Sequence, residues 1–287
     1  MNVSARQVAE AFIASCRDEL DAPKPGNVHV LSPAGRKTPE DFVRSAQVAA
    51  GPLSVAGARV GRRIFGAVEA TRAAVGRNTN LGIILLCAPL AAAAEERASD
   101  LRAAVARMLR GLDVTDAELA FRAIAAAAPG GLGRAERHDV FEPASVSLRE
   151  AMAEAADRDR IARQYASDFH DVFALGEPIL AAALARGLER RWATLAVFLG
   201  FLSMFPDSHI VREHGTDVGE EVRRAAMRLR EQFDAARDPA EVLPEVLAYD
   251  RSLTARSVNP GTSADLTVAT LFASRLRNIL PSARNND

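Results

Sequence analysis

The chain has 287 residues, of which 48% are hydrophobic, 25% are charged and only 5% are aromatic, and its formal net charge is −1. This length is enough for one large or two small domains with a sizeable core. The balanced charge gives no electrostatic signal for nucleic acid or for an anionic membrane surface, so we expect neither as a partner.

Helical patterns dominate the chain from its first residues onward. Val8, Phe12 and Cys16 stand four residues apart, which is typical of an amphipathic helix. The acidic residues Glu10, Asp18 and Glu19 argue against a signal peptide. Further along, Pro and acidic residues at 39–41 suit a first helical turn. The patterns predict helices at 4–20, from 39 to a break or kink at 51–52, and at 53–75, 81–94, 98–110, 116–128, 146–157, 158–174, 178–187 and 190–204, with two or three more after residue 215.

No strand pattern or internal repeat accompanies these helices, and no apolar run is long enough to span a bilayer. The stretch 129–143, rich in Gly and Pro, is expected to be a mobile loop rather than a linker, because no change of composition follows it. Cys16 and Cys87 are expected to be buried free thiols, which favours a reducing, cytoplasmic location. We therefore predict one all-α globular domain over residues 1–287, with roughly ten to twelve packed helices.

The first polar motif is KPGNVH, residues 24–29. Pro followed by Gly predicts a turn, because Pro fixes φ and Gly permits a positive φ. Such a turn presents backbone N–H groups and flanking side chains, and Lys24 would suit a phosphate as a point charge. A plain surface turn is the alternative.

The second motif is RNTNLG, residues 77–82, directly before a long apolar run. Thr79 or Asn80 is a suitable N-cap for the helix that follows. A single cap needs one polar residue, whereas Asn78 and Arg77 are present as well. Because the N-terminus of a buried helix offers N–H groups and a positive dipole, the excess favours a bound phosphate or other anion. Pure capping remains the alternative.

The third motif is PDSHIVREHG, residues 206–215, after an apolar helix. His209 and His214 are five residues apart and do not share a helix face, which disfavours a zinc site. Asp207 is a better candidate for a Mg²⁺ ligand beside bound phosphates. A polar loop between helices is the alternative.

The fourth motif is NPGTSADL, residues 259–266. Thr262 and Asp265 stand in capping-box register before another apolar helix. Whether Asp265 also contacts a ligand stays open. If the four junctions meet at one rim of an all-helical protein, they form a polar site large enough for a nucleotide.

Together and in this order, the four motifs resemble the triphosphoribosyl-dephospho-CoA synthase family, over about residues 22–276. The resemblance implies an all-helical transferase that takes ATP and 3′-dephospho-CoA. It implies that the ribose of ATP is joined to the 2′-hydroxyl of the acceptor and that adenine is released. The product is the precursor of the prosthetic group of the citrate lyase and malonate decarboxylase acyl carrier proteins, and Mg²⁺ is implied with ATP.

Two motifs depart from that family. Its synthases read KPGLVD and NTHKG, whereas this chain has His29 in place of the acid and Asn80-Leu81 in place of His-Lys. The chain is more similar to a divergent branch in archaea and methylotrophic bacteria, in which some members stand among genes for the methanopterin-linked C1 pathway. The fold is therefore a safer expectation than the substrate.

The resemblance and the motifs together assign three groups of residues. Asp207 and Asp265 are expected to stabilise the positive charge on the anomeric carbon and to hold the metal, in either order, and a histidine is expected to move protons. A binding protein for a nucleotide or CoA-like ligand that has lost catalysis, and a helical scaffold in a multi-enzyme complex, are the alternatives. The catalytic candidates are Asp207, His209 and Asp265; the metal candidates are Asp207 and Asp265; the candidates for binding substrate or phosphate are Lys24, Gly26, Asn27, His29, Arg77, Asn78, Thr79, Asn80, Arg212, His214, Asn259 and Thr262.

Overall fold

The computed structural model describes residues 3–32, 37–96 and 99–280, and these residues form helices and loops without a strand. The all-α class is confirmed, and the described residues form fourteen α-helices, more than the ten to twelve predicted. The helices are α1 (Ala5–Asp21), α2 (Pro39–Leu53), α3 (Val60–Val75), α4 (Leu81–Ala94), α5 (Leu101–Arg110), α6 (Val114–Ala127), α7 (Leu148–Ala155), α8 (Arg160–Ala166), the π-helix η1 (Val172–Gly176), α9 (Glu177–Ala185), α10 (Arg190–Met204), α11 (Ser208–His214), α12 (Thr216–Ala235), the 3-10 helix η2 (Pro239–Val242), α13 (Leu243–Ala255) and α14 (Gly261–Ile279).

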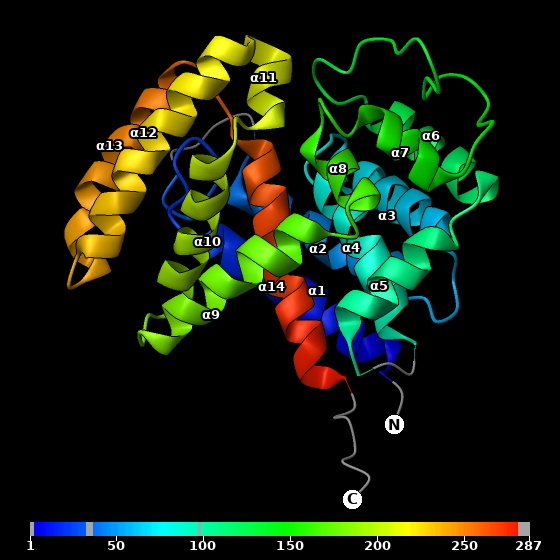
Figure 1. Cartoon of the computed structure of the whole chain (residues 1–287), viewed down its shortest axis with the longest axis horizontal. Coiled ribbons are helices and arrows are strands. Elements are labelled where there is room, and N and C mark those ends of the chain that lie inside the picture. Colours follow the sequence, from blue (N-terminus) through cyan, green and yellow to red (C-terminus); the bar gives the residue numbers. More distant parts are fainter. Residues whose placement is uncertain (1–2, 33–36, 97–98, 281–287) are drawn as a thin grey trace, which may run out of the picture.

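Helix α14 lies at the centre of this arrangement (Figure 1). It packs against α1, α4, α10 and η1, with α9, α10, α12 and α13 on one side and α3 to α8 on the other. All fourteen residues of α4 are buried. Burial of a Leu or Ile side chain contributes about 1.5–3 kcal/mol to the free energy of folding. The apolar side chains of α4 are therefore the main source of its stability. The buried apolar residues form one continuous cluster.

Most helix starts follow from local capping. Ser4, Thr38 and Ser147 each cap a helix and form a capping box with the residue three positions on. The bounds predicted for α4 and α10 are correct. For α6, however, Asp113 is the cap and forms a capping box with Asp116, so this helix begins at Val114 rather than at the predicted residue 116.

The largest differences from the predicted helices lie at 53–59, around residue 168 and at α11. Helix α2 continues through Pro52 in its last turn and ends at Leu53, so that the stretch predicted as helix at 53–75 begins only at Val60. The helix predicted at 158–174 is interrupted by Asp168 and Phe169, which adopt positive φ angles of 51° and 59°. Short helices such as α11, within a stretch predicted to be a loop, explain the higher count.

The remaining expectations concern membranes, cysteines and domains. None of the helices in the described ranges is both long and apolar enough to cross a membrane by itself, although the bent pair α10–α11 passes by length and composition. Both cysteines are free thiols, with Cys87 buried and Cys16 only partly buried. The assignment of residues 1–287 to a single domain stays a prediction.

Candidate active site

The start of α14 brings the other polar motifs together. Asn27 Nδ2 donates to Asn259 Oδ1 over 2.9 Å, which joins KPGNVH to NPGTSADL. The His209 ring places Nδ1 2.9 Å from the Asn259 carbonyl oxygen, and the His209 N–H donates to Thr262 Oγ1 over 3.2 Å. Two motifs that are far apart in the sequence are therefore held on the short turn before α14.

The remaining motif, RNTNLG, meets α14 one turn further along. The Asp265 carboxylate lies directly against Gly82, the second residue of α4. A Cβ atom at position 82 would come within 3.0 Å of Asp265 Oδ2 and 2.6 Å from Ile161 Cδ1. Only glycine permits this approach without a shift of its neighbours. All four motifs thus converge on the N-terminal half of α14.

Asp207 holds α11 and α14 together. Its Oδ1 accepts from the N–H groups of His209 and Ile210 over 3.0 and 3.2 Å, as the N-cap of α11. Its Oδ2 accepts from the N–H and the hydroxyl of Ser263 over 2.7 and 2.8 Å. Burial raises the pKa of this carboxyl, and the bonds from Ser263 oppose that rise. Four bonds occupy the usual acceptor sites of a carboxylate, which leaves little capacity for a metal ion.

The capping box predicted at the start of α14 is wrong. Pro260 is the N-cap of this helix and makes no side-chain cap bond. Thr262 instead places Oγ1 3.0 Å from Ser208 Oγ, and it is Asp207, from before α11, that binds the first turn of α14. Capping from a distant segment cannot be recognised from local spacing.

Asp265 has a different environment. This carboxylate makes no hydrogen bond or ion pair with any residue that the structure describes, although it is only partly exposed. Burial raises its pKa well above the usual value, and the nearby acids Glu19, Asp207 and Asp159 raise it further, while Lys37 opposes them. An acid in this setting is stabilised by a bound cation or by a proton.

The start of α4 has donors without acceptors. Asn78 Oδ1 accepts from the Leu81 N–H over 3.1 Å, and Thr79 Oγ1 lies 2.6 Å from Ser45 Oγ. Asn80 is only 5% exposed, and its Nδ2 finds no partner within the described ranges. The next N–H groups in the turn have no intrahelical acceptor, because they belong to the first turn of the helix. The geometry therefore provides buried donors beside a helix N-terminus, as an anion site requires.

Lys24 is part of a buried network. Its Nζ donates to the carbonyl oxygens of Glu19 and Val28 over 2.7 and 2.8 Å and lies 3.0 Å from Glu19 Oε1. Burial lowers the pKa of Lys24, and the same burial raises that of Glu19. Because an ammonium has three protons, none remains for a phosphate in this conformation, and the geometry favours a structural role for Lys24.

His29 and Gly26 complete this network through Asp250. The fully buried His29 ring accepts from the Leu31 N–H at Nδ1 over 3.2 Å and places Nε2 3.5 Å from Asp250 Oδ2. Asp250 Oδ1 accepts from the Gly26 N–H over 2.9 Å. Burial would raise the pKa of Asp250, but His29 and the Gly26 N–H hold it below its usual value. His29 faces this acid rather than an open site.

The predicted cationic contacts lie at the rim. Arg212 donates to Asp159 Oδ2 over 3.2 Å and to the Gly130 carbonyl over 2.9 Å, so it joins α11 to α8 and to the loop between α6 and α7. Arg77 lies 3.9 Å from an Asp41 carboxylate oxygen. His214 places Nε2 3.1 Å from the Ser257 carbonyl, on the exposed side of α11.

The implied Mg²⁺ fits this site only in part. The described residues include no group of three or more His, Cys, Asp or Glu side chains placed to hold a metal ion. Asp207 is already saturated by hydrogen bonds, whereas the carboxylate of Asp265 is available. Mg²⁺ is often bound through one or two carboxylates together with substrate phosphates and water, so the donor set suits an ion brought in with ATP.

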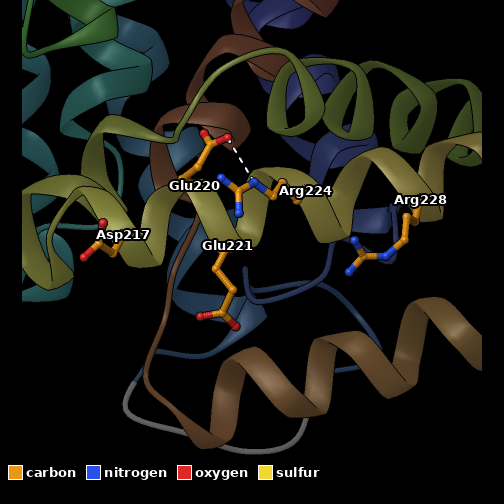
Figure 2. A pocket seen from close by; sticks show the side chains of 5 residues that line it. All are labelled: Asp217, Glu220, Glu221, Arg224 and Arg228. Carbon is orange, nitrogen blue, oxygen red and sulfur yellow. Dashed lines mark ion pairs between the residues drawn. The ribbon is translucent and has the colours of Figure 1, made fainter.

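A surface hollow elsewhere does not compete as a site. It is lined by five charged side chains on α12, Asp217, Glu220, Glu221, Arg224 and Arg228, as Figure 2 shows. Arg224 lies 3.4 Å from Glu220, so these charges compensate one another. No residue of the four motifs lines it.

Sequence reasoning missed five residues that shape the site. Glu19, Asp159 and Asp250 stand in ordinary helical or capping positions and carry no local signal. Glu213 was noticed within its motif but given no role. Gly82 could have been found, because an isolated glycine inside an apolar helix often marks close approach of another group.

Comparisons with known proteins agree with this fold and with the family that the motifs resemble. The sequence model of the family described as CitG, ATP:dephospho-CoA triphosphoribosyl transferase, matches residues 5–283. A crystal structure of a proposed triphosphoribosyl-dephospho-CoA synthase from Archaeoglobus fulgidus superposes with a TM-score of 0.64 at 25% identity, and the match covers 83% of this chain and 99% of that chain. A search of curated proteins finds no match. The resemblance read from the four motifs is confirmed: the chain belongs to the ATP:dephospho-CoA triphosphoribosyl transferase family and is a transferase.

Proposed function

We propose that this protein transfers the triphosphoribosyl group of ATP to a hydroxyl group of dephospho-CoA or a related acceptor, and that it releases adenine. The reaction would supply a cofactor or prosthetic group in the cytoplasm. Membership of the transferase family supports the reaction class. The observation that carries the assignment of the site is the lone carboxylate of Asp265 beside the start of α4, where the four motifs meet.

A negative charge near the sugar would stabilise the transition state of this reaction. As the bond between the ribose and adenine breaks, positive charge develops on the anomeric carbon. Asp265 forms no ion pair with a described residue, and burial makes its ionised form costly in the free protein although Lys37 opposes this effect. The ionised carboxylate is stabilised most when a positive charge forms next to it. This interaction is therefore stronger in the transition state than with the bound substrate, and so it lowers the barrier.

The triphosphate needs donors that are not already used. The buried Asn80 Nδ2 and the first-turn N–H groups of α4 are suited to one phosphate group. Arg77 and Arg212 at the rim would add charge-assisted hydrogen bonds. Arg212 would have to exchange its bonds with Asp159 and the Gly130 carbonyl for phosphate oxygens.

Mg²⁺ would be held by Asp265 together with the phosphates. When bound, the ion neutralises phosphate charge. Asp207 serves instead to place α11 against α14, the helix that carries Asp265, and so to hold the His209 N–H against Thr262. Asn259 and Thr262 are held in the same turn, where their oxygens border the site.

Mass spectrometry of the purified protein with ATP, Mg²⁺ and 3′-dephospho-CoA tests this function. We expect free adenine and the mass of the coupled product. The same assay with a small-molecule extract as acceptor separates a wrong acceptor from a wrong reaction. Absence of adenine with both acceptors would contradict triphosphoribosyl transfer.

One observation favours a second function, the binding of a nucleotide or CoA-like ligand without catalysis. Lys24 and His29 already form contacts with buried acids, and Asn80-Leu81 stands where the synthases have His-Lys. Calorimetry distinguishes the two functions: saturable binding of ATP without adenine release would support the binding protein.

A further inference from the structure

The His209 ring has two nitrogen atoms in different surroundings. Nδ1 lies 2.9 Å from the Asn259 carbonyl oxygen. Because a carbonyl oxygen can only accept, the hydrogen atom belongs on Nδ1. In the neutral ring Nε2 is then without a proton and has a free lone pair. The His209 side chain is 22% exposed, whereas the His29 ring is fully buried.

Glu213 faces this free nitrogen from one turn further along α11. Its Oε1 lies 3.6 Å from His209 Nε2, in an i, i+4 pair. Gly130 of the loop between α6 and α7 packs against the same carboxylate, so closely that a Cβ atom there would come within 3.0 Å of it. The other charged groups around the ring are Asp207, which precedes α11, and the Arg212–Asp159 pair between α11 and α8. Asp207 is already bound by four donors, so Glu213 is the acid best placed to respond to a change of charge on the ring.

We propose that His209 Nε2 accepts the proton of the acceptor hydroxyl and that Glu213 is the positioning residue that orients the ring and stabilises it once protonated. This proposal rests on the proposed function, which supplies the hydroxyl. The Asn259 carbonyl selects the tautomer and the Glu213 carboxylate stabilises the imidazolium, while Asn259 belongs to the turn that leads into α14, the helix that carries Asp265.

The step balances without another reactant. The hydroxyl oxygen forms a bond to the anomeric carbon while its proton passes to Nε2. The bond from that carbon to the adenine nitrogen breaks, and its electron pair leaves with adenine, which gains one proton. The proton lost by the hydroxyl equals the proton gained by adenine, so His209 returns to its neutral state within one cycle.

Nitrogen-15 NMR of protein labelled at histidine tests the tautomer directly and needs no turnover. The chain has five histidines, and His209→Gln assigns the resonance by its loss. We expect the shifts of a ring protonated at Nδ1. In Glu213→Gln, we expect the Nε2 resonance of His209 to shift, because the carboxylate that faces this nitrogen is lost. Glu231→Gln, on the exposed side of α12, is the matched control and should leave this resonance unchanged.

Turnover provides the second readout. Glu213→Gln is expected to lower kcat about tenfold, a part of the 10²–10⁴-fold that general-base catalysis contributes, with KM within twofold. A ring protonated at Nε2, or an Nε2 resonance in Glu213→Gln equal to that of the control, would overturn the proposal. Absence of adenine release by the unaltered protein would refute the proposed function instead, and the NMR result would show separately whether the His209–Glu213 arrangement exists.

Discussion

Gly82 offers the sharpest test of how closely Asp265 must approach α4. In Gly82→Ala, the added methyl group would lie 2.6 Å from Ile161 Cδ1 and even closer to Asp265 Oδ2, whereas carbon atoms in contact are normally 3.5–4.0 Å apart. The carboxylate must therefore retreat by about 1 Å. Since a displacement of that size can cost about a hundredfold in rate, we expect kcat/KM to fall by about two orders of magnitude.

The effect on stability should be much smaller than the effect on rate. Alanine is favoured over glycine inside a helix by about 1 kcal/mol, while overpacking costs about 1–3 kcal/mol, so the free energy of unfolding should fall by no more than about 2 kcal/mol. Adenine release and urea unfolding measure the two quantities. Gly51→Ala is the matched control, because this helical residue of α2 has no atom within 4 Å of an added Cβ.

The control should keep full activity and gain a little stability. In Asp265→Ser, where the carboxylate is absent, the cost of adding alanine at position 82 should shrink. Normal adenine release by Gly82→Ala would refute the claim that the position of Asp265 against α4 matters for the reaction.

Three further predictions follow from the buried charges. Asp207→Asn should lower the free energy of unfolding by about 2 kcal/mol in urea titrations, because an amide N–H would face donors such as Ser263; unchanged stability would argue against the four-bond arrangement. Lys24→Met should lower the free energy of unfolding by about 3–5 kcal/mol and leave little folded protein by circular dichroism, because Glu19 would be left buried and unpaired. A folded variant that loses only its affinity for ATP would instead support a phosphate contact. Burial raises the pKa of Asp265 above its value in the unfolded chain, so this residue makes the protein less stable as pH rises from the unfolded pKa through the folded pKa. The Asp265→Asn variant should therefore melt about 1–3 °C above the unaltered protein at pH 8, and this gain should vanish near pH 4. A difference in melting temperature that does not depend on pH would contradict the raised pKa.

The helical fold was predictable because the periodic apolar pattern and the caps are local. The bounds of α4 follow from an uninterrupted apolar run after Asn80, and the start of α2 follows from Thr38 and the residues after it. Short helices such as α11 were missed, because a polar composition and a length of seven residues leave no periodic signal.

The candidate site was predictable in its composition but not in its roles. The motifs indicated four segments as candidates, and the structure brings all four to one helix start. Spacing along the chain could not reveal that Lys24 is turned inward to Glu19, or that Asp207 binds a helix more than fifty residues away. Both side chains looked available in the sequence and are occupied in the fold, whereas Asp265, which looked like a cap, has an unused carboxylate.

The most direct test of this account is adenine release by Asp265→Asn, measured beside the unaltered protein with ATP, Mg²⁺ and whichever acceptor supports turnover. Asparagine keeps the shape of the side chain and removes the charge that would stabilise the anomeric carbon and hold the ion. We expect adenine release to fall by at least about a hundredfold in a variant that remains folded. Adenine release at the normal rate would contradict the placement of the active site at the start of α14.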